Sequence, residues 1–251
     1  MVSWLMVAPL TLPVANVVFA FRESTLPGKL IVLLLLAGSV LAWSIMLTKA
    51  VELRNAKRAS QAFLAAFRKE RLPTGLFRRQ RRFPDSPLQS IYEMTCKALI
   101  TEFHPSGSGV PPDELFAEDP DQAPAVLKQA QLNALHDVAE GNLAEQALRL
   151  ENNMGFLASA ISASPFLGLL GTVWGVMDAF GGMAVRGVAT LSAVAPGISA
   201  ALLTTVVGLL VALPSTVGYN ILTHRIRYLC VQMENFAQEL TASLQRSFGE
   251  E

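Results

Sequence analysis

The 251-residue sequence has no net charge and few of the side chains that build catalytic or metal sites. Its 20 Lys and Arg residues balance its 20 Asp and Glu residues, so the overall charge does not favour binding to nucleic acid. Cys96 and Cys230 fall in segments that the charge pattern below assigns to the cytoplasm, where a disulfide is not expected. The three histidines have no ligand-like spacing with these cysteines or with each other. The sequence therefore predicts no metal and no cofactor, and it lacks the residue pairs that a membrane protease or transferase would need.

Charge is also missing from three long segments of the chain. The first is the 19-residue run between Lys29 and Lys49, the second is the 26 residues of 152–177, and the third is the 37 residues of 187–223. A helix needs about 20 apolar residues to cross the hydrocarbon layer of a membrane. The pattern therefore predicts an all-α integral membrane protein with three transmembrane helices, at residues 29–49, 152–180 and 191–222.

The basic residues predict the orientation of these helices. Eleven of the 20 Lys and Arg residues lie between Lys49 and Arg82, directly after the first helix. The positive-inside rule places this side in the cytoplasm. We therefore expect the N-terminus and a short turn at 181–190 outside, and a cytoplasmic helical region at 50–151 together with a cytoplasmic C-terminal helix at 223–251.

The first 28 residues are predicted to form an outer segment rather than a further span. Residues 1–21 are uncharged, but they lack the basic start of a signal peptide, and Pro9 and Pro13 disfavour a transmembrane helix. A helix lying at the outer interface with Trp4 among the headgroups is the favoured interpretation. A signal peptide and a fourth span remain the alternatives.

The cytoplasmic region is expected to be a bundle of amphipathic helices that continue the membrane helices. The first helix should run on to about Arg71, and a short helix should follow the Pro-containing segment near residue 87. A loop is expected at 104–124, where Pro, Gly, Ser and acidic residues are frequent. A further helix is expected from about Pro124 into the second span, with Gly141 as its only obvious breaker. The C-terminal helix has an apolar stripe formed by Ile226, Leu229, Met233, Phe236 and Leu240.

Small residues recur at four-residue spacing in the second and third spans. Such rows allow helix backbones to approach closely in lipid, so partners on more than one side, and hence an oligomer, are expected. The rows are Ser164, Gly168 and Thr172; Gly171, Gly175 and Ala179; Gly197, Ala201 and Thr205; and Ala200, Thr204, Gly208 and Ala212.

Two threonines and one aspartate are the candidate polar site of the spans. Thr172 and Thr205 should lie near mid-depth, where each hydroxyl either bonds the carbonyl one turn back or belongs to a polar ring that passes protons. The spans contain no ionisable residue at mid-depth, so a titrating carboxylate for proton transport would have to come from another protein. Asp178 should lie at the outer mouth, either as a solvated residue or as a proton uptake site.

Two stretches of the second and third predicted spans resemble a known family. "SPFLGLLGTVWGVMDAF" (164–180) and "VAPGISAALLTTVVGLLVALPSTVGYN" (194–220) are similar to the paired signature of the TolQ/ExbB/MotA proton-channel family, most closely its TolQ and ExbB branches. The first span with its flanks is similar to the same region of TolQ. By motif, the family's two pore threonines fall on Thr172 and Thr205, and its pore-helix prolines fall on Pro165 and Pro196.

The resemblance implies a homopentamer in the bacterial inner membrane. Its second and third helices would enclose a dimer of a single-span, TolR-like or ExbD-like partner that carries the membrane aspartate, with a TolA-like or TonB-like protein as a further partner. The implied function is that of a stator-like proton-channel subunit, not an enzyme. It would use the proton motive force to drive work across the cell envelope, in a system of the Tol-Pal or Ton type.

One position departs from the family pattern. Ala200, in "PGISAAL", stands where TolQ and ExbB usually have a glutamate. A changed proton path, reliance on the partner's acid alone and a channel that no longer conducts are all consistent with this alanine. The alternative function is therefore a non-conducting scaffold of the same fold that assembles the single-span partner.

Overall fold

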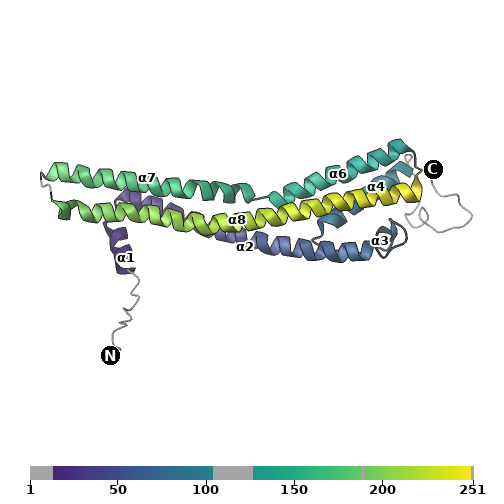
Figure 1. Cartoon of the computed structure of the whole chain (residues 1–251), viewed down its shortest axis with the longest axis horizontal. Coiled ribbons are helices and arrows are strands. Elements are labelled where there is room, and N and C mark those ends of the chain that lie inside the picture. Colours follow the sequence, from purple (N-terminus) through teal and green to yellow (C-terminus); the bar gives the residue numbers. More distant parts are fainter. Residues whose placement is uncertain (1–13, 104–126, 188–189, 250–251) are drawn as a thin grey trace, which may run out of the picture. The chain divides into compact units, whose positions relative to one another are not determined.

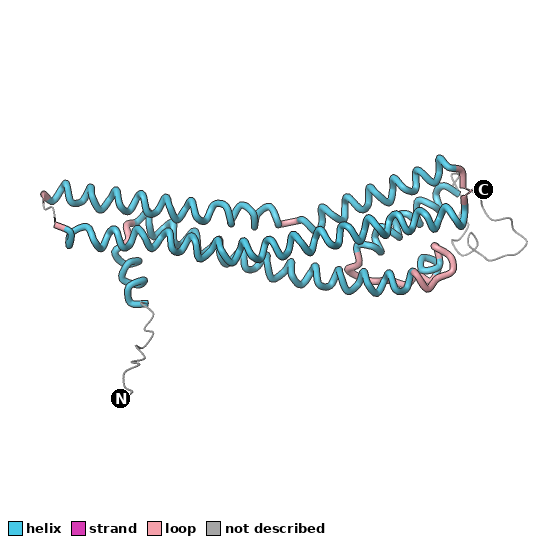
Figure 2. The backbone as a smooth tube through the Cα atoms, viewed as in Figure 1, coloured by secondary structure: helices cyan, strands magenta, loops and turns pink. Residues whose placement is uncertain are grey.

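The computed structural model describes residues 14–103, 127–187 and 190–249, and over these residues it contains helices but no strand (Figure 2). A single isolated bridge joins Leu127 to Gly249. The predicted all-α class is therefore confirmed. The helices are α1 (Val14–Glu23), α2 (Leu26–Phe67), α3 (Gly75–Arg78), α4 (Pro87–Phe103), α6 (Gln129–Glu151), α7 (Met154–Arg186) and α8 (Leu191–Phe248), labelled in Figure 1.

The chain divides into two compact units. We call Met1–Ile45 with Gly155–Tyr219 the membrane unit, and Met46–Met154 with Asn220–Glu251 the bundle unit. Helices α2 and α8 contribute residues to both. Among the described residues, three stretches are long and apolar enough to cross a membrane, namely Leu26–Phe67, Gln129–Arg186 and Leu191–Phe248, as the three uncharged runs predict.

Within the membrane unit, α7 and α8 lie side by side (Figure 1). Their small residues make the close contacts between the two helices. A Cβ at Gly208 would lie 2.6 Å from the carbonyl oxygen of Ser164, and a Cβ at Gly175 would lie 2.8 Å from the Cβ of Ala201. Larger side chains would force the two helices apart. The outward faces are apolar, with Leu30, Val173 and Leu210 all more than half exposed, as expected for surfaces that contact lipid tails or another apolar chain.

The core of the bundle unit is aromatic. Phe63 and Phe67 of α2 meet Tyr92 of α4 and Phe236 of α8, with ring centroids 5.3–6.2 Å apart. Such edge-to-face and stacked contacts stabilise a core beyond simple area burial. The apolar stripe predicted for the C-terminal helix is confirmed, because all five of its residues are at most 3% exposed.

Several expected boundaries differ from the structure. The helix predicted to run into the second span is interrupted at Asn152 and Asn153, where Asn153 has φ of 66° and separates α6 from α7. Asparagine is one of the few residues that adopt this left-handed conformation readily. The turn expected at 181–190 starts late, because α7 continues to Arg186 before Gly187, with φ of 65°, ends it. The expected loop at 104–124 lies outside the described residues, as do residues 1–13 of the N-terminal segment.

Candidate functional site

Three threonine side chains meet where α7 and α8 cross in the membrane unit. Thr172 comes from the middle of α7, and Thr204 and Thr205 come from α8. Thr204 is only 1% exposed, whereas Thr172 and Thr205 are half-buried. The two threonines predicted to form a polar site, Thr172 and Thr205, thus lie side by side. They are at the partly open edge of the contact between the two helices.

The hydroxyls of this cluster are closely spaced. The oxygen atoms of Thr172 and Thr205 are 2.5 Å apart, and Thr204 lies 3.4 Å from Thr172. Two backbone carbonyls complete the cluster. The carbonyl oxygen of Gly168 lies 2.9–3.2 Å from all three hydroxyls, and that of Ala201 lies 3.0 Å from Thr172 and 2.7 Å from Thr204.

These distances allow two hydrogen-bond arrangements of the hydroxyl pair, one with Thr172 as the donor and one with Thr205 as the donor. An oxygen pair at 2.5 Å is repulsive unless one hydroxyl donates its proton to the other. If Thr172 donates to Thr205, the Thr205 proton goes to the Gly168 carbonyl; if Thr205 donates, the Thr172 proton goes to the Ala201 carbonyl. The pair can therefore change from one hydrogen-bond arrangement to the other while keeping two hydrogen bonds.

One of the two roles considered for these threonines, bonding to the carbonyl one turn back, is seen at Thr172. Its hydroxyl bonds the Gly168 carbonyl at 3.2 Å. Thr205 instead reaches the same carbonyl across the helix contact at 3.1 Å. Intrahelical bonding therefore accounts for only part of the cluster, and the remainder ties α7 to α8.

The glycines bring the threonines together. A Cβ at Gly168 would lie 2.9 Å from the carbonyl oxygen of Thr204, and one at Gly171 would lie 2.6 Å from the hydroxyl oxygen of Thr204. A Cβ at Gly197 would lie 2.9 Å from the Cβ of Ala179. The rows of small residues are thus used in contact between α7 and α8 of the same chain, so they do not by themselves require a second subunit.

The other predicted site residues are spread along the two helices. Asp178 is exposed and lies six residues beyond Thr172, which is about 9 Å along the helix axis, so it is not part of the threonine cluster. Pro165 and Pro196 lie inside α7 and α8 and are half-buried. Ala200 is 2% exposed, so this position is covered within the chain.

Sequence reasoning did not assign a role to Thr204. The signal was present, because Thr204 lies in the row of small residues with Ala200 and Gly208 and directly precedes Thr205. Its burial, together with bonds to the carbonyls of Gly168 and Ala201, makes it the anchor of the cluster. The hydroxyls of Thr172 and Thr205 are then left as the half-buried pair.

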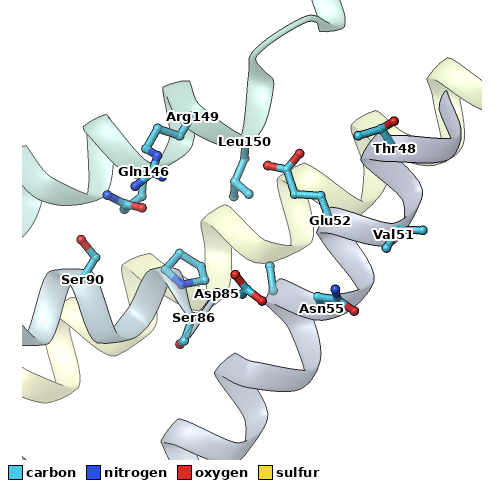
Figure 3. Close-up of a pocket in the computed structure, with 12 residues that line it drawn as sticks. Thr48, Val51, Glu52, Asn55, Asp85, Ser86, Ser90, Gln146, Arg149 and Leu150 are labelled. Carbon is cyan, nitrogen blue, oxygen red and sulfur yellow. The ribbon is translucent and has the colours of Figure 1, made fainter. Parts of the chain in front are cut away.

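The bundle unit contains a cavity of about 530 Å³ among α2, the start of α4 and the end of α6 (Figure 3). Glu52, Asp85 and Gln146 are among the polar residues that border it. Beside it, the buried ammonium of Lys49 lies 2.9 Å from Glu52 and 3.4 Å from the carbonyl oxygen of Arg149. No group of three or more His, Cys, Asp and Glu side chains able to hold a metal occurs among the described residues.

Two buried titratable groups of the bundle unit are structural. Burial raises the pKa of the Cys96 thiol to about 12, and burial together with the nearby Cys96 raises the pKa of Tyr92. The Tyr92 hydroxyl accepts the backbone N–H of Phe77 at 3.0 Å. A thiol held protonated in the interior is unsuited to nucleophilic chemistry.

Comparison with known proteins gives consistent similarities. Residues 110–235 match the model of a family described as the MotA/TolQ/ExbB proton channel family. The chain is 33% identical over 218 residues to the Tol-Pal system protein TolQ of Pseudomonas aeruginosa, covering 87% of each sequence. It is 31% identical over 241 residues to TolQ of Haemophilus influenzae, covering 93% of this chain and 96% of that protein. It is 28% identical to the biopolymer transport protein ExbB of Pseudomonas putida, covering 90% of this chain and 62% of that protein.

Proposed function

Because the chain belongs to the MotA/TolQ/ExbB proton channel family, we propose that it is the proton-channel subunit of an inner-membrane motor driven by the proton motive force. In this function it works with a single-span TolR-like or ExbD-like partner and drives work across the cell envelope. The observation that carries the proposal is the hydroxyl pair of Thr172 and Thr205, 2.5 Å apart on two membrane helices.

The hydroxyl pair is suited to handing protons on rather than to storing them. A threonine hydroxyl does not titrate in the physiological range, but it can accept a proton on one side and donate one on the other. The two hydrogen-bond arrangements of Thr172 and Thr205 would allow such a proton transfer next to a carboxylate. The uncharged runs of the chain contain no carboxylate, so the partner's membrane aspartate supplies the group that binds and releases the proton.

The assembly proposed around this site is a pentamer whose α7 and α8 helices surround a dimer of the partner. The half-buried positions of Thr172 and Thr205 support this arrangement, because their hydroxyls are not wholly covered by their own chain. The basic cluster after the first span supports an orientation with the bundle unit in the cytoplasm and the α7–α8 turn outside. Asp178, exposed near that end of α7, then lies at the outer mouth.

A non-conducting scaffold is the second candidate, and Ala200 favours it. This residue is uncharged and only 2% exposed, so it gives the pathway no titrating group where the family usually has a glutamate. The scaffold would use the same helix contacts to hold the partner. It would differ from the channel only in carrying no proton flux.

The first experiment is the native mass of the complex extracted gently from its own membrane. Five copies of this chain with two copies of a single-span, aspartate-bearing protein are expected. A monomer or a simple dimer would contradict the proposed motor.

Proton flux into liposomes containing this complex then separates channel from scaffold. We expect Thr172→Val and Thr205→Val to abolish flux while Thr205→Ser retains it. The matched control is Thr216→Val, because the Thr216 hydroxyl on α8 bonds the Ala212 carbonyl one turn back, at 2.8 Å, and no other partner among the described residues. No flux through the unsubstituted complex, together with lower stability of both cluster variants, would favour the scaffold.

A further inference from the structure

A basic groove lies between α2 and α8 in the bundle unit, and none of the residues that line it belongs to the threonine cluster. It has a volume of about 520 Å³, and no acidic residue is among those that line it in the described structure. Arg54 and Lys57 border it from α2, and His224 and Arg225 border it from α8. All four side chains are exposed.

The positive charge of this groove is not neutralised within the described part of the chain. The ion pairs formed among residues 14–103, 127–187 and 190–249 involve neither Arg54 nor Arg225. Glu52, close by in sequence on α2, is paired with Lys49 instead. The ammonium of Lys57 lies 4.8 Å from the ring centroid of Tyr228, a cation–π contact that holds it at the groove without cancelling its charge.

Both walls of the groove begin where a membrane-crossing run ends. The uncharged run of α2 stops at Lys49, and Arg54 follows about 8 Å further along the helix axis. The uncharged run that continues through α8 stops at Thr223, directly before His224 and Arg225. The groove is therefore at the level of the lipid headgroups, where polar phosphates meet the ends of the hydrocarbon chains.

The remaining wall residues suit an amphipathic ligand. Val51 is 59% exposed and Tyr228 is 44% exposed, which gives the groove an apolar and an aromatic surface beside its cations. Tyrosine is enriched at the membrane interface because one end of its ring is apolar and the other is polar. A free inorganic anion would make no use of this surface.

We propose that the groove binds an anionic phospholipid, with the headgroup phosphate held by Arg54 and Arg225 and the start of the acyl chains against Val51 and Tyr228. Guanidinium groups match phosphate oxygens in geometry and in charge. The bound lipid would brace α2 against α8 where both leave the membrane. This site is separate from the proposed proton pathway and does not depend on it.

The test is lipid binding by the full-length protein in detergent, measured as lipid adducts in native mass spectrometry. Dioleoyl-phosphatidylglycerol, which is anionic, is compared with dioleoyl-phosphatidylcholine, which is zwitterionic. The groove variant is Arg54→Gln with Arg225→Gln. The matched control is Arg58→Gln with Arg227→Gln, which removes two exposed cations from the same helices outside the residues that line the groove.

We expect the groove variant to bind phosphatidylglycerol at least tenfold more weakly, because each cation near an anionic surface contributes about fivefold in affinity. The control pair should change binding less than threefold, and Arg54→Lys with Arg225→Lys should retain most of it. Equal losses in the groove and control pairs would overturn the proposal in favour of a diffuse surface charge. Displacement of the lipid by millimolar inorganic phosphate would overturn it in favour of a site for free anions.

Discussion

The ammonium nitrogen of Lys49, on α2, lies 3.4 Å from the backbone carbonyl oxygen of Arg149, in the last turn of α6. The carbonyls at the end of a helix lack intrahelical partners and carry partial negative charge, so a buried cation is favourable there. Glu52 lies 2.9 Å from the same ammonium and balances its charge. Lys49 thus fixes α2 to the end of α6, next to the cavity of Figure 3.

Replacing Lys49 should destabilise the bundle unit. Lys49→Met keeps the length of the side chain but removes the bonds to the Arg149 carbonyl and to Glu52, and we expect a loss of about 2 kcal/mol in the free energy of unfolding. Thermal unfolding of the detergent-solubilised protein measures it. Arg58→Met, at an exposed position of the same helix, is the control and should change stability by less than about 0.5 kcal/mol. Equal melting temperatures for the two variants would show that Lys49 does not fix the helices.

Gly208→Ala should separate α7 from α8. The added Cβ would lie 2.6 Å from the Ser164 carbonyl oxygen, and neither backbone can move without opening the threonine cluster. Overpacking of this kind costs about 1–3 kcal/mol. The measurement is retention of the folded species after heating, followed by size-exclusion chromatography.

Gly141→Ala is the control for this effect. Nothing lies within 4 Å of a Cβ at Gly141, an exposed position of α6. Alanine there should be neutral or stabilise the helix by up to about 1 kcal/mol. If both glycine variants were equally stable, close contact at Gly208 would not determine how the two helices pack.

Much of this fold follows from patterns that have a direct physical cause. Uncharged runs of sufficient length predicted the three spans, and the apolar spacing from Ile226 to Leu240 predicted the buried stripe of the C-terminal helix. Periodicity was less reliable near the boundary of the units. Val51 belongs by spacing to the apolar stripe of α2 but is 59% exposed, because it faces the cavity and the basic groove rather than the core.

The candidate site was predictable in its residues but not in its contacts. Spacing placed Thr172 and Thr205 at similar depth, yet it could not specify which faces of the two helices meet. That choice depends on Gly168 and Gly208, whose missing side chains admit the neighbouring backbone. The buried Lys49 was assigned to the basic cytoplasmic cluster, because its partner is a backbone carbonyl 100 positions away that no side-chain pattern reveals.

The bundle unit should lose stability at alkaline pH. The folded-state pKa of Cys96 is raised from 9.0 to about 12 by burial, and that of Tyr92 is also raised, mainly by burial. In the unfolded chain the Cys96 thiol loses its proton above pH 9 while the folded chain keeps it. The stabilising contribution of Cys96 is therefore complete below pH 9 and decreases between pH 9 and 12, by about 1.4 kcal/mol per pH unit, and that of Tyr92 begins to decrease only above pH 10.

Chemical denaturation at a series of pH values measures this slope, and Cys96→Ala identifies its source. The variant should be less stable at pH 7, by about 1 kcal/mol, because it leaves a small cavity at a position with 0% exposure. Its stability should nevertheless fall less steeply above pH 9 than that of the parent. Parallel curves for the two proteins would remove Cys96 as the cause.

Asn153 provides a direct test of the break between α6 and α7. Its φ of 66° is accessible to glycine and asparagine, whereas a β-branched side chain is strained there by about 1–2 kcal/mol. We therefore expect Asn153→Gly to be neutral or slightly stabilising and Asn153→Val to lower the melting temperature. Asn152→Val is the matched control, since the neighbouring residue is also exposed but has an ordinary φ of −52°.

If the chain instead formed one continuous helix from α6 into α7, Asn153→Gly would be the destabilising substitution, because glycine weakens a helix interior by about 1 kcal/mol. The sign of the difference between the glycine and valine variants at position 153 therefore distinguishes a broken helix from a continuous one.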